Sequence, residues 1–543
     1  MTTNRSQQAQ ALRAQYDASL PSVAHLLCDR HDPERVALCY ENGDGDKSAY
    51  TYGDLRHLSA KFAGALRRQN VQKGDRVATL LPKGPELLIS VLALWRLGAI
   101  HVPLFTAFGP QAISYRVDNS GAGVLITDVK NREKLTGVES ATANSASGRV
   151  ITVEQKRESG SAETLSFWSL LEEADPVTES PGVVGDDLFI LLYTSGTTGH
   201  PKGVEVPVRA LASFEAYMRY GLDLRPDDVF WNIADPGWAY GLYYGLVGPL
   251  LLGQTFIMFN APFSVDETYR LMMEYQVTNY AAAPTVYRAM RAQGVPEGIK
   301  SGLRLRVLSS AGEPLNPDVS TWAKSQLGVP IYDHYGQTEQ GMVVNNHHDP
   351  ICRGPVKAGS MGQSMPGFRA AIVDSNGGEL PPGSEGELAI DTVNSLLYWF
   401  RGYYQDPERT RERFAAGPRY CLTGDTASMD DDGYIYFSGR SDDIISSAGY
   451  RIGPFEVESA LMVHPAVAEA AVVGIPDESR GEIVKAFIVL RPNITPTDEL
   501  EGELQQFVKQ NLSAHSYPRV IEFIESLPKT PSGKIQRFLL RQR

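Results

Sequence analysis

The stretch LFILLYTSGTTGHPKG, residues 188–203, joins a run of large apolar residues directly to a segment rich in glycine and hydroxyl side chains. The apolar run predicts a buried strand that ends at the first glycine. Glycine permits close approach of the backbone, and successive N–H groups in such a turn form a concave site for anions. Further donors in the segment are the hydroxyls and the amine of Thr194, Ser195, Thr197, Thr198 and Lys202. The stretch therefore favours a polyphosphate-binding loop at the end of a strand.

A solvated turn is the alternative interpretation for the short segment SGTTG alone. The spacing also differs from the Walker A motif, because Pro201 and Lys202 stand where that motif has Gly-Lys. The complete stretch is more specific than either part, since strand, glycines, hydroxyls and lysine follow one another in one order.

The composition restricts the class of protein. The chain has 543 residues, of which 42% are hydrophobic, and this exceeds one ordinary domain. Its 51 Lys and Arg against 64 Asp and Glu give a net charge of −13, which disfavours nucleic acid or an anionic membrane as a main partner. Four cysteines without metal-site or redox spacing exclude a disulfide framework: Cys28, Cys39, Cys352 and Cys421.

Two apolar runs resemble membrane spans. Residues 86–100 contain Arg96, and residues 246–259 contain Gly248 and Pro249. Neither run has the roughly 20 uninterrupted apolar residues that a span needs, and the N-terminus lacks the apolar segment of a secretory signal. We therefore expect a buried helix for the first run and a cytoplasmic protein without a membrane span.

Short apolar runs alternate with helical patterns through the first 320 residues. A strand at 75–82, a helix at 85–97 and a strand at 99–104 form one βαβ-like unit. Such alternation predicts an α/β architecture with largely parallel sheets. Residues 367–390 read as two strands joined by a Gly/Pro-rich turn, which predicts an antiparallel β part. The Ser/Thr/Ala-rich residues 138–161 are expected to form an exposed loop.

The last hundred residues have a different pattern. A helix at 454–464 and two strands, AEAAVVGIPD and EIVKAFIVL, precede an amphipathic helix at 499–512 and a final strand. This order predicts a compact α+β domain. Its boundary is expected in the polar, glycine-bearing residues 439–451.

Six segments in one order resemble the adenylate-forming superfamily, which contains acyl-CoA synthetases, luciferase-like enzymes and peptide-synthetase adenylation domains. They are the stretch at 193–203, SAGEPL (310–315), YDHYGQTE (332–339), LTGD (422–425), GRSDDIISSAGYRIGPFEVE (439–458) and LPKTPSGKIQR (527–537). The resemblance covers about residues 20–540, and ADPGW (234–238) is similar to the short- and medium-chain acyl-CoA synthetase branch. It implies that a carboxylate attacks the α-phosphate of ATP, giving acyl-AMP and pyrophosphate, and that a thiol then attacks the acyl-AMP. ATP, Mg²⁺ and coenzyme A are the implied cofactors.

The resemblance also implies the architecture. We expect the α/β class, with a large domain of parallel-rich sheets plus a β part over residues 1–440. A small, mobile α+β domain is expected over residues 441–543. Asp442 matches the family hinge, about which the small domain rotates between the two steps.

For the nucleotide, the resemblance implies that Glu339 coordinates Mg²⁺, with Thr194 as a second metal candidate, and that Thr338 contacts the α-phosphate. Asp425 accepts both ribose hydroxyls. The other implied contacts are Ser195, Gly196, Thr197, Thr198, Gly199 and Lys202 at the phosphates, Gly312, Glu313, Pro314, Asp333 and Tyr335 around the adenine, and Arg440 and Arg451 at ribose or phosphate. The alternatives are a solvated acid for Glu339, core packing for Tyr335 and structural ion pairs for the two arginines.

Lys534 is implied as the lysine that reaches the site during adenylation and contacts the carboxylate. With Lys202, Thr338 and Glu339 it completes the implied catalytic group. Lys534 also resembles a regulatory acetylation site of the family, which implies a protein acetyltransferase and deacetylase as partners.

Gly449 is implied to let the pantetheine of coenzyme A pass close to the backbone. Ser446 stands where many relatives carry lysine, which puts one ligand contact in doubt.

The acid pocket is implied at the segment around residue 240. Gly336 stands where acetate-specific relatives carry a tryptophan that closes the pocket, so we expect an open channel and a longer acid. The expected wall residues are Trp238, Tyr240 and Gly241. Tyr240, Tyr243 and Tyr244 alternatively shorten the channel, form a slot for an aromatic acid, or pack in the core. Amino-acid-activating relatives place an aspartate at about the Trp238 position to hold the ammonium group; the tryptophan here disfavours an amino-acid substrate, since a buried ammonium group needs a partner.

We therefore predict an acid–thiol ligase that activates a short- or medium-chain fatty acid and transfers the acyl group to coenzyme A. The alternative is an adenylating enzyme that loads an acyl or aromatic acid onto a carrier protein in trans. A non-catalytic nucleotide sensor is disfavoured because Lys202, Glu339 and Lys534 are all present. A second copy of the chain, as a homodimer, is a further candidate partner.

Overall fold

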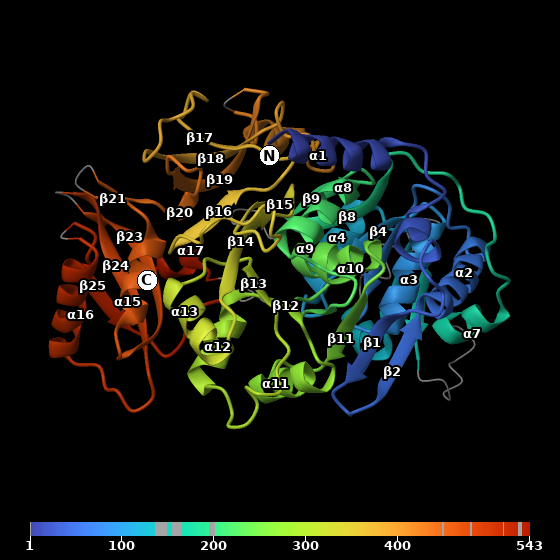
Figure 1. Ribbon diagram of the computed structural model, residues 1–543, viewed down its shortest axis with the longest axis horizontal. Coiled ribbons are helices and arrows are strands. Elements are labelled where there is room, and N and C mark those ends of the chain that lie inside the picture. The colour runs from blue at the N-terminus through green and yellow to red at the C-terminus, as the bar shows by residue number, and fades with distance from the viewer. Residues whose placement is uncertain are drawn as a thin grey trace.

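The computed structural model describes residues 2–135, 149–154, 165–194, 201–415, 417–447, 450–477, 480–513, 515–529 and 535–543. The side chains of residues 2–6 and of Arg451 lie outside this description. The described strands form three sheets (Figure 1).

A seven-stranded sheet contains the apolar strand at the start of the stretch 188–203 and the strand that begins at Lys202. All of its described neighbours are parallel except the last pair, in which β9 runs antiparallel to β8. In spatial order the strands are β7 (Leu165–Ser166), β6 (Arg149–Val153), β5 (Val124–Asp128), β3 (Arg76–Leu80), β4 (Ile100–Pro103), β8 (Leu188–Thr194) and β9 (Lys202–Pro207).

The βαβ unit predicted at residues 75–104 is confirmed. Helix α3 (Pro85–Arg96) lies between β3 and β4 in the chain and begins at a proline. Proline is tolerated there because the N–H group at the first helical position has no intrahelical hydrogen-bond partner in any case. Almost all of α3 is buried, including Arg96, which forms a bidentate ion pair with Asp29 through two 2.7 Å hydrogen bonds. The first apolar run is thus a buried helix, and no helix among the described residues is long and apolar enough to cross a membrane.

One expectation for this sheet is wrong. Residues 138–161 were expected to form an exposed loop, but their described part contains strand β6, which pairs with β5 and buries Ile151 and Thr152. The alternation in RVITV is sufficient for a short strand once β5 supplies a neighbour.

A thirteen-stranded sheet runs through the middle of the molecule. Its parallel half extends from β1 to β14, and its antiparallel half from β15 to β17. The antiparallel pair predicted at residues 367–390 is confirmed as β17 and β18, and the antiparallel pairing already begins at β15. In spatial order the strands are β17 (Ala370–Val373), β18 (Glu385–Asp391), β19 (Tyr420–Met429), β20 (Ile435–Arg440), β16 (Ser360–Ser364), β15 (Gly341–Asn345), β14 (Ile331–Gln337), β13 (Val307–Ala311), β12 (Asn279–Ala282), β10 (Val229–Asn232), β11 (Thr255–Asn260), β1 (Val36–Asn42) and β2 (Lys47–Thr51).

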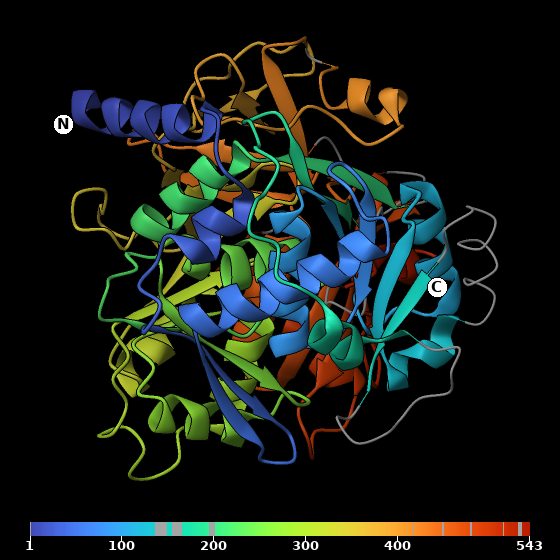
Figure 2. The ribbon, with the colours of Figure 1, turned by 90° about the vertical axis from the view of Figure 1, so that its right-hand side faces the viewer.

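Helices cover both sheets. Helix α2 (Tyr52–Arg68) begins at a capping box in which Thr51 and Asp54 exchange side-chain to backbone hydrogen bonds, and it packs on α3. Helix α1 (Thr2–Asp17) packs along α8 and reaches the antiparallel half of the large sheet, where Arg13 bonds the Leu396 carbonyl (Figures 1 and 2). The others here are η1 (His25–Asp29), α4 (Pro110–Ser120), α5 (Val129–Arg132), η2 (Glu133–Leu135), α7 (Phe167–Glu173), α8 (Ala210–Ala216), η3 (Tyr217–Gly221), α9 (Ala239–Gly241), η4 (Leu242–Val247), α10 (Gly248–Leu251), α11 (Val265–Glu274), α12 (Pro284–Gln293), α13 (Pro317–Gln326) and α14 (Pro407–Glu412).

The C-terminal residues build the third sheet around their own apolar cluster. Its strands are β22 (Tyr450–Ile452), β21 (Ile445–Ser447), β24 (Gly481–Leu490), β23 (Val467–Asp477) and β25 (Val520–Phe523), with helices α15 (Pro454–Val463), α16 (Asp498–Asn511) and α17 (Arg537–Leu540). This sheet lies beside α13 and β20, where Asn316 donates a 3.1 Å hydrogen bond to Ser459 (Figure 1). The change of sheet falls between Arg440 and Ile445, and the predicted hinge at Asp442 lies in this interval.

Candidate active site

The two ends of the opening motif lie side by side at the edge of the seven-stranded sheet. Thr194 ends β8 and pairs in register with Lys202, which begins β9. The Thr194 hydroxyl is buried and has no hydrogen-bond partner among the described residues. Such a hydroxyl is available to a ligand, as the predicted metal or phosphate role requires. The loop residues predicted to bind phosphate lie outside the described residues: Ser195, Gly196, Thr197, Thr198 and Gly199.

Glu339 lies in the turn between β14 and β15 and is only 4% exposed. Its Oε1 accepts hydrogen bonds from the Tyr403 hydroxyl at 2.6 Å and from Arg413 at 2.7 Å. Burial alone raises the pKa of Glu339, but the charge of Arg413 and these hydrogen bonds bring the pKa below its ordinary value. The group is therefore a carboxylate at neutral pH.

The donor set fits Mg²⁺ delivered with ATP. No cluster of three or more His, Cys, Asp or Glu that could hold a metal occurs in the described ranges. Mg²⁺ is commonly held by one or two carboxylates together with substrate phosphates rather than by an all-protein cage. A single buried carboxylate at Glu339, close enough to Lys202 to interact electrostatically, agrees with that pattern.

Lys202 belongs to the same charged group. Its ammonium nitrogen lies 4.5 Å from the centroid of the Tyr403 ring. Burial and then the nearby Arg413 lower the pKa of Lys202, while Glu339 raises it. The structure thus brings together Lys202 and Glu339, which are 137 positions apart in the sequence (339 − 202).

The side chain of Asp425, on β19, is oriented by hydrogen bonds from two residues of β14. Its Oδ2 accepts hydrogen bonds from the Tyr335 hydroxyl at 2.5 Å and from Gln337 at 2.8 Å, and the side chain is 6% exposed. Burial raises its pKa, although Arg440, with its guanidinium 4.0 Å away, and Tyr335 act in the opposite direction. The predicted ribose carboxylate and the predicted adenine-stacking tyrosine are therefore neighbours.

The other adenine-side candidates lie at the ends of β13 and β14. Gly312 is exposed with a φ of +96°. The Glu313 carboxylate turns toward α12, where it accepts hydrogen bonds from Thr285 at 2.8 Å and Arg288 at 2.6 Å, and Pro314 follows it in the same turn. Burial raises the pKa of Asp333 to about 8, although backbone hydrogen bonds from Leu315 and His334 lower it. A neutral Asp333 can donate as well as accept a hydrogen bond.

At the start of the C-terminal part, Arg440 donates from Nε to Asp442 at 3.0 Å, and Arg541 donates to the Asp442 carbonyl at 3.0 Å. Gly449, Lys534 and the side chain of Arg451 lie outside the described residues, so their predicted roles stay predictions.

The tyrosines near residue 240 behave differently from one another. Tyr243 and Tyr244 are fully buried and hold the β14–β15 turn, because Tyr243 donates to the Thr338 carbonyl at 3.2 Å and Tyr244 accepts from the Met342 N–H at 2.8 Å. Core packing is the correct alternative for these two. Tyr240 is half-buried, and its hydroxyl lies 3.3 Å from that of Tyr217.

Trp238 stands among aromatic rings. Its ring centroid lies 5.5 Å from that of Phe105 and 5.4 Å from that of Phe108. The indole N–H is buried without a hydrogen-bond partner in the described part of the chain. Gly241 is required by close packing, since a Cβ there meets the Asp235 carbonyl oxygen at 2.2 Å.

The prediction that Gly336 opens a channel is wrong in its physical reason. A Cβ at this position meets the Gly341 carbonyl oxygen at 2.2 Å and the Met342 Cα at 2.7 Å. These atoms belong to β15, which pairs with β14 through an irregularity at Tyr335 and Gly336. The space beside this glycine is therefore filled by a neighbouring strand.

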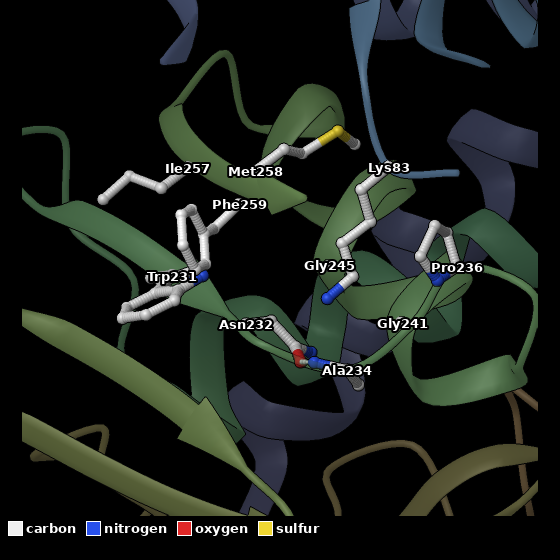
Figure 3. A pocket seen from close by; sticks show the side chains of 10 residues that line it. All are labelled: Lys83, Trp231, Asn232, Ala234, Pro236, Gly241, Gly245, Ile257, Met258 and Phe259. Atoms are coloured by element: carbon white, nitrogen blue, oxygen red, sulfur yellow. Dashed lines mark hydrogen bonds between the residues drawn. The ribbon is translucent and has the colours of Figure 1, made fainter. Parts of the chain in front are cut away.

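A small cavity adjoins the predicted wall. Figure 3 shows the Lys83 amine pointing into it, with Trp231 and Phe259 on one side and Gly241 on another. Lys83 donates to the Ile233 carbonyl at 2.7 Å, and burial lowers its pKa. The cavity volume is about 10 Å³, which is room for about one water molecule and too little for a carboxylic acid.

Sequence reasoning missed three residues of this site. Tyr403 and Arg413 contact Glu339, and Gln337 contacts Asp425. Gln337 lies inside the motif YGQTE and was available to the same reasoning. Tyr403 and Arg413 lie in the charged segment RGYYQDPERTRERF, which has no spacing that indicates chemistry.

Comparison with known proteins assigns the family. The family model described as AMP-binding enzyme matches residues 28–404, and the model described as AMP-binding enzyme C-terminal domain matches residues 456–534. The first match alone spans more than half of the chain.

Individual relatives agree with these matches. The chain is 39% identical over 530 residues to the acetyl-coenzyme A synthetase of Bacillus subtilis (strain 168), covering 96% of this chain and 90% of the relative. The crystal structure of the Brucella canis acyl-CoA synthetase is 49% identical with a TM-score of 0.77, covering 99% of this chain and 96% of that one. The anthranilate CoA ligase AuaEII in complex with anthranoyl-AMP is 28% identical with a TM-score of 0.85 and 96% coverage of both chains.

The relatives are CoA ligases, so the carrier-protein alternative is not favoured. ATP, Mg²⁺ and coenzyme A are accordingly the cofactors of this chain. The chain belongs to the AMP-binding enzyme family, as an AMP-forming acyl-CoA synthetase of the adenylate-forming superfamily.

Proposed function

We propose that this synthetase activates a short- or medium-chain carboxylic acid whose tail lies against the side chains of Trp238 and Tyr240. The observation that carries the proposal is the uncharged aromatic character of this wall, where Trp238, Phe105 and Phe108 form a cluster of mutually contacting rings. An apolar or aryl tail gains from such a surface, whereas an ammonium group finds no carboxylate in these contacts. The relatives act on acids of several kinds, so their names support a carboxylic acid and leave its length to experiment.

In the proposed adenylation step, Lys202 contacts the phosphates and Lys534 contacts the attacking carboxylate and the bridging oxygen. Glu339 holds Mg²⁺ and Asp425 holds the ribose. The convergence of Lys202, Glu339 and Asp425 with Tyr335 supports these roles. Catalysis then consists largely of positioning and of charge stabilisation at phosphate oxygens. Mg²⁺ supplies neutralisation of the phosphate charge when it is bound with ATP.

For the second step we propose that residues 441–543 rotate about Asp442, which brings Gly449 to the coenzyme A path. The separate C-terminal sheet and the position of Asp442 between two sheets support this proposal. Acetylation of Lys534 by a protein acetyltransferase, with reversal by a deacetylase, is proposed on the resemblance. A cytoplasmic location is proposed from the features of the sequence, and a homodimeric state is proposed as a further candidate for experiment.

The test is ATP–pyrophosphate exchange with linear, branched and aromatic acids, each assayed with and without coenzyme A. We expect exchange without coenzyme A, thioester formation with it, and activity that continues well beyond acetate in a chain-length series. Strict preference for acetate would contradict the proposed acid class. Absence of exchange with every acid would contradict the adenylation step itself.

A further inference from the structure

The segment between β18 and β19 brings two side chains to the predicted phosphate site. Tyr403 lies against β9, where it forms an isolated bridge with Val204 and the next N–H, of Tyr404, bonds the Gly203 carbonyl at 2.7 Å. Arg413 follows helix α14, and its side chain is 16% exposed. Neither residue belongs to a motif that the resemblance implies.

These two side chains and Glu339 form a closed triangle of hydrogen bonds. The Tyr403 hydroxyl donates to Glu339 Oε1 at 2.6 Å, and Arg413 donates from Nη2 to the same oxygen at 2.7 Å. Arg413 also donates from Nε to the Tyr403 hydroxyl oxygen at 2.7 Å. Both bonds to the carboxylate end on Oε1, so Oε2 takes no part in them.

The same pair reaches two other parts of the nucleotide site. The Tyr403 ring lies under the Lys202 ammonium, 4.5 Å from the nitrogen to the ring centroid, within the range of a cation–π interaction. Arg413 donates from Nη1 to the Leu422 carbonyl at 2.9 Å, three residues before Asp425. One tyrosine and one arginine therefore contact the metal candidate, the phosphate lysine and the strand of the ribose carboxylate.

A structural ion pair explains only part of this arrangement. A buried carboxylate needs a partner, and Arg413 alone would supply it. It explains neither the convergence of two donors on one oxygen nor the ring placed under Lys202.

We propose that Tyr403 and Arg413 are positioning residues of the adenylation step. They hold Glu339 by one oxygen, so that the other oxygen is presented to the Mg²⁺ that arrives with ATP. The Tyr403 ring holds Lys202 beside the site until the triphosphate takes its charge. This inference rests on the proposed roles of Glu339 and Lys202.

The physical reason is orientation. A free carboxylate on a flexible side chain loses rotamer entropy when it binds a metal, and outer partners that fix the ligand remove part of that loss. Losing such partners typically lowers metal affinity about 10–100-fold. Tyr403→Phe removes the hydroxyl and keeps the ring, whereas Tyr403→Leu removes both, so the two functions of this residue can be separated.

The test measures Mn²⁺ binding together with ATP by electron paramagnetic resonance, without acid, so that no turnover occurs. We expect Tyr403→Phe and Arg413→Met to weaken Mn²⁺ binding about 10–100-fold. Tyr403→Leu should additionally raise the KM for ATP beyond that of Tyr403→Phe, with a smaller change in kcat. The matched control is Arg411→Met, an exposed arginine of the same segment, which should bind Mn²⁺ like the unmodified enzyme.

Mn²⁺ titrations of Tyr403→Phe and Arg413→Met that coincide with that of the unmodified enzyme would overturn the inference. If Arg413→Met fails to fold, as thermal unfolding would reveal, Tyr403→Phe decides alone, because it deletes one oxygen and leaves no charge unpaired. Glu339→Gln distinguishes failure of the metal role proposed for Glu339 from failure of the positioning roles proposed for Tyr403 and Arg413. Unchanged Mn²⁺ affinity in Glu339→Gln would refute the metal role of Glu339. If Mn²⁺ affinity falls in Glu339→Gln but not in Tyr403→Phe or Arg413→Met, only the positioning roles are refuted.

Discussion

The hydroxyl of Tyr335 donates a 2.5 Å hydrogen bond to Oδ2 of Asp425, across 90 positions of sequence. It joins β14, on the parallel side of the large sheet, to β19, on the antiparallel side. Gln337 donates to the same oxygen, which leaves Oδ1 toward Arg440. These hydrogen bonds fix the orientation of the carboxylate in the structure, which would lower the entropic cost of the ribose contact proposed for Asp425.

Asp425→Asn should raise the KM for ATP about 10–100-fold, since hydrogen bonds to a charged group contribute about 1.5–3 kcal/mol. ATP–pyrophosphate exchange at varied ATP measures this change. The control is Asp431→Asn in the exposed turn after β19, which should keep the KM of the unmodified enzyme. An equal rise in both variants would speak against a specific ribose contact.

Asp333 predicts a pH dependence of stability in the ligand-free enzyme. Its folded pKa of about 8 lies above the ordinary value of 3.8, so the folded state keeps a proton that the unfolded state releases. This contribution stabilises the fold below pH 4 and is lost progressively as the pH rises from about 4 to about 8. Asp333→Asn should remove that part of the decline. Urea unfolding between pH 5 and 8.5 measures it, and parallel curves for both proteins would contradict the prediction.

Gly336→Ala should destabilise the fold, because its Cβ would lie 2.2 Å from the Gly341 carbonyl oxygen. Overpacking of this kind typically costs about 1–3 kcal/mol, which thermal unfolding detects. Activity should fall with every acid rather than with long acids only. Unchanged stability combined with loss of the longer acids would restore the channel interpretation.

Lys534→Ala should abolish acyl-AMP formation and leave thioester formation from supplied acyl-AMP largely intact, because the lysine charge is needed only at the triphosphate and the attacking carboxylate. The two half-reactions are assayed separately. Lys529→Ala serves as the control, since Lys529 is exposed and pairs with Glu469. Equal loss of both half-reactions would refute the assignment.

Asp442→Pro should slow thioester formation more than adenylation, because a fixed φ restricts the backbone rotation proposed at this residue. Asp442→Ala removes only the carboxylate that accepts from Arg440 and separates the side-chain effect from the backbone effect. Loss of adenylation alone in the proline variant would contradict a hinge at this position. Single-turnover measurements of each step distinguish these results.

Many strands and helices could be predicted because short stretches of sequence determine them. The run DRVATLLP and the apolar helix that starts at Pro85 determine β3 and α3 with their immediate neighbours. Strand β6 was not predicted because RVITV is buried only through its neighbours β5 and β7, which lie elsewhere in the sequence, and the residues around it are small and polar. Gly336 was assigned a ligand-related reason, whereas its reason lies in the strand packed against it.

Some residues of the candidate site could likewise be predicted from local sequence motifs, whereas others could not. Glu339 and Asp425 stand in motifs whose order in the sequence indicates a nucleotide, and the structure places Tyr335 beside Asp425. Tyr403 and Arg413 act through side chains that meet Glu339 from 64 and 74 positions away. Such convergence depends on how β9, β14 and β19 are arranged, and no spacing within the segment expresses it.

The guanidinium of Arg440 lies near two carboxylates: its Nε is 3.0 Å from Asp442 Oδ1, and its Nη1 is 4.0 Å from Asp425 Oδ1. The guanidinium is attracted to both acids, so neutralising or occupying one acid would let the side chain move toward the other. On the proposed roles of Asp425 at the ribose and Asp442 at the hinge, release of AMP and rotation of residues 441–543 would be linked through one cation, and a substitution at Arg440 would change the relative rates of the two half-reactions.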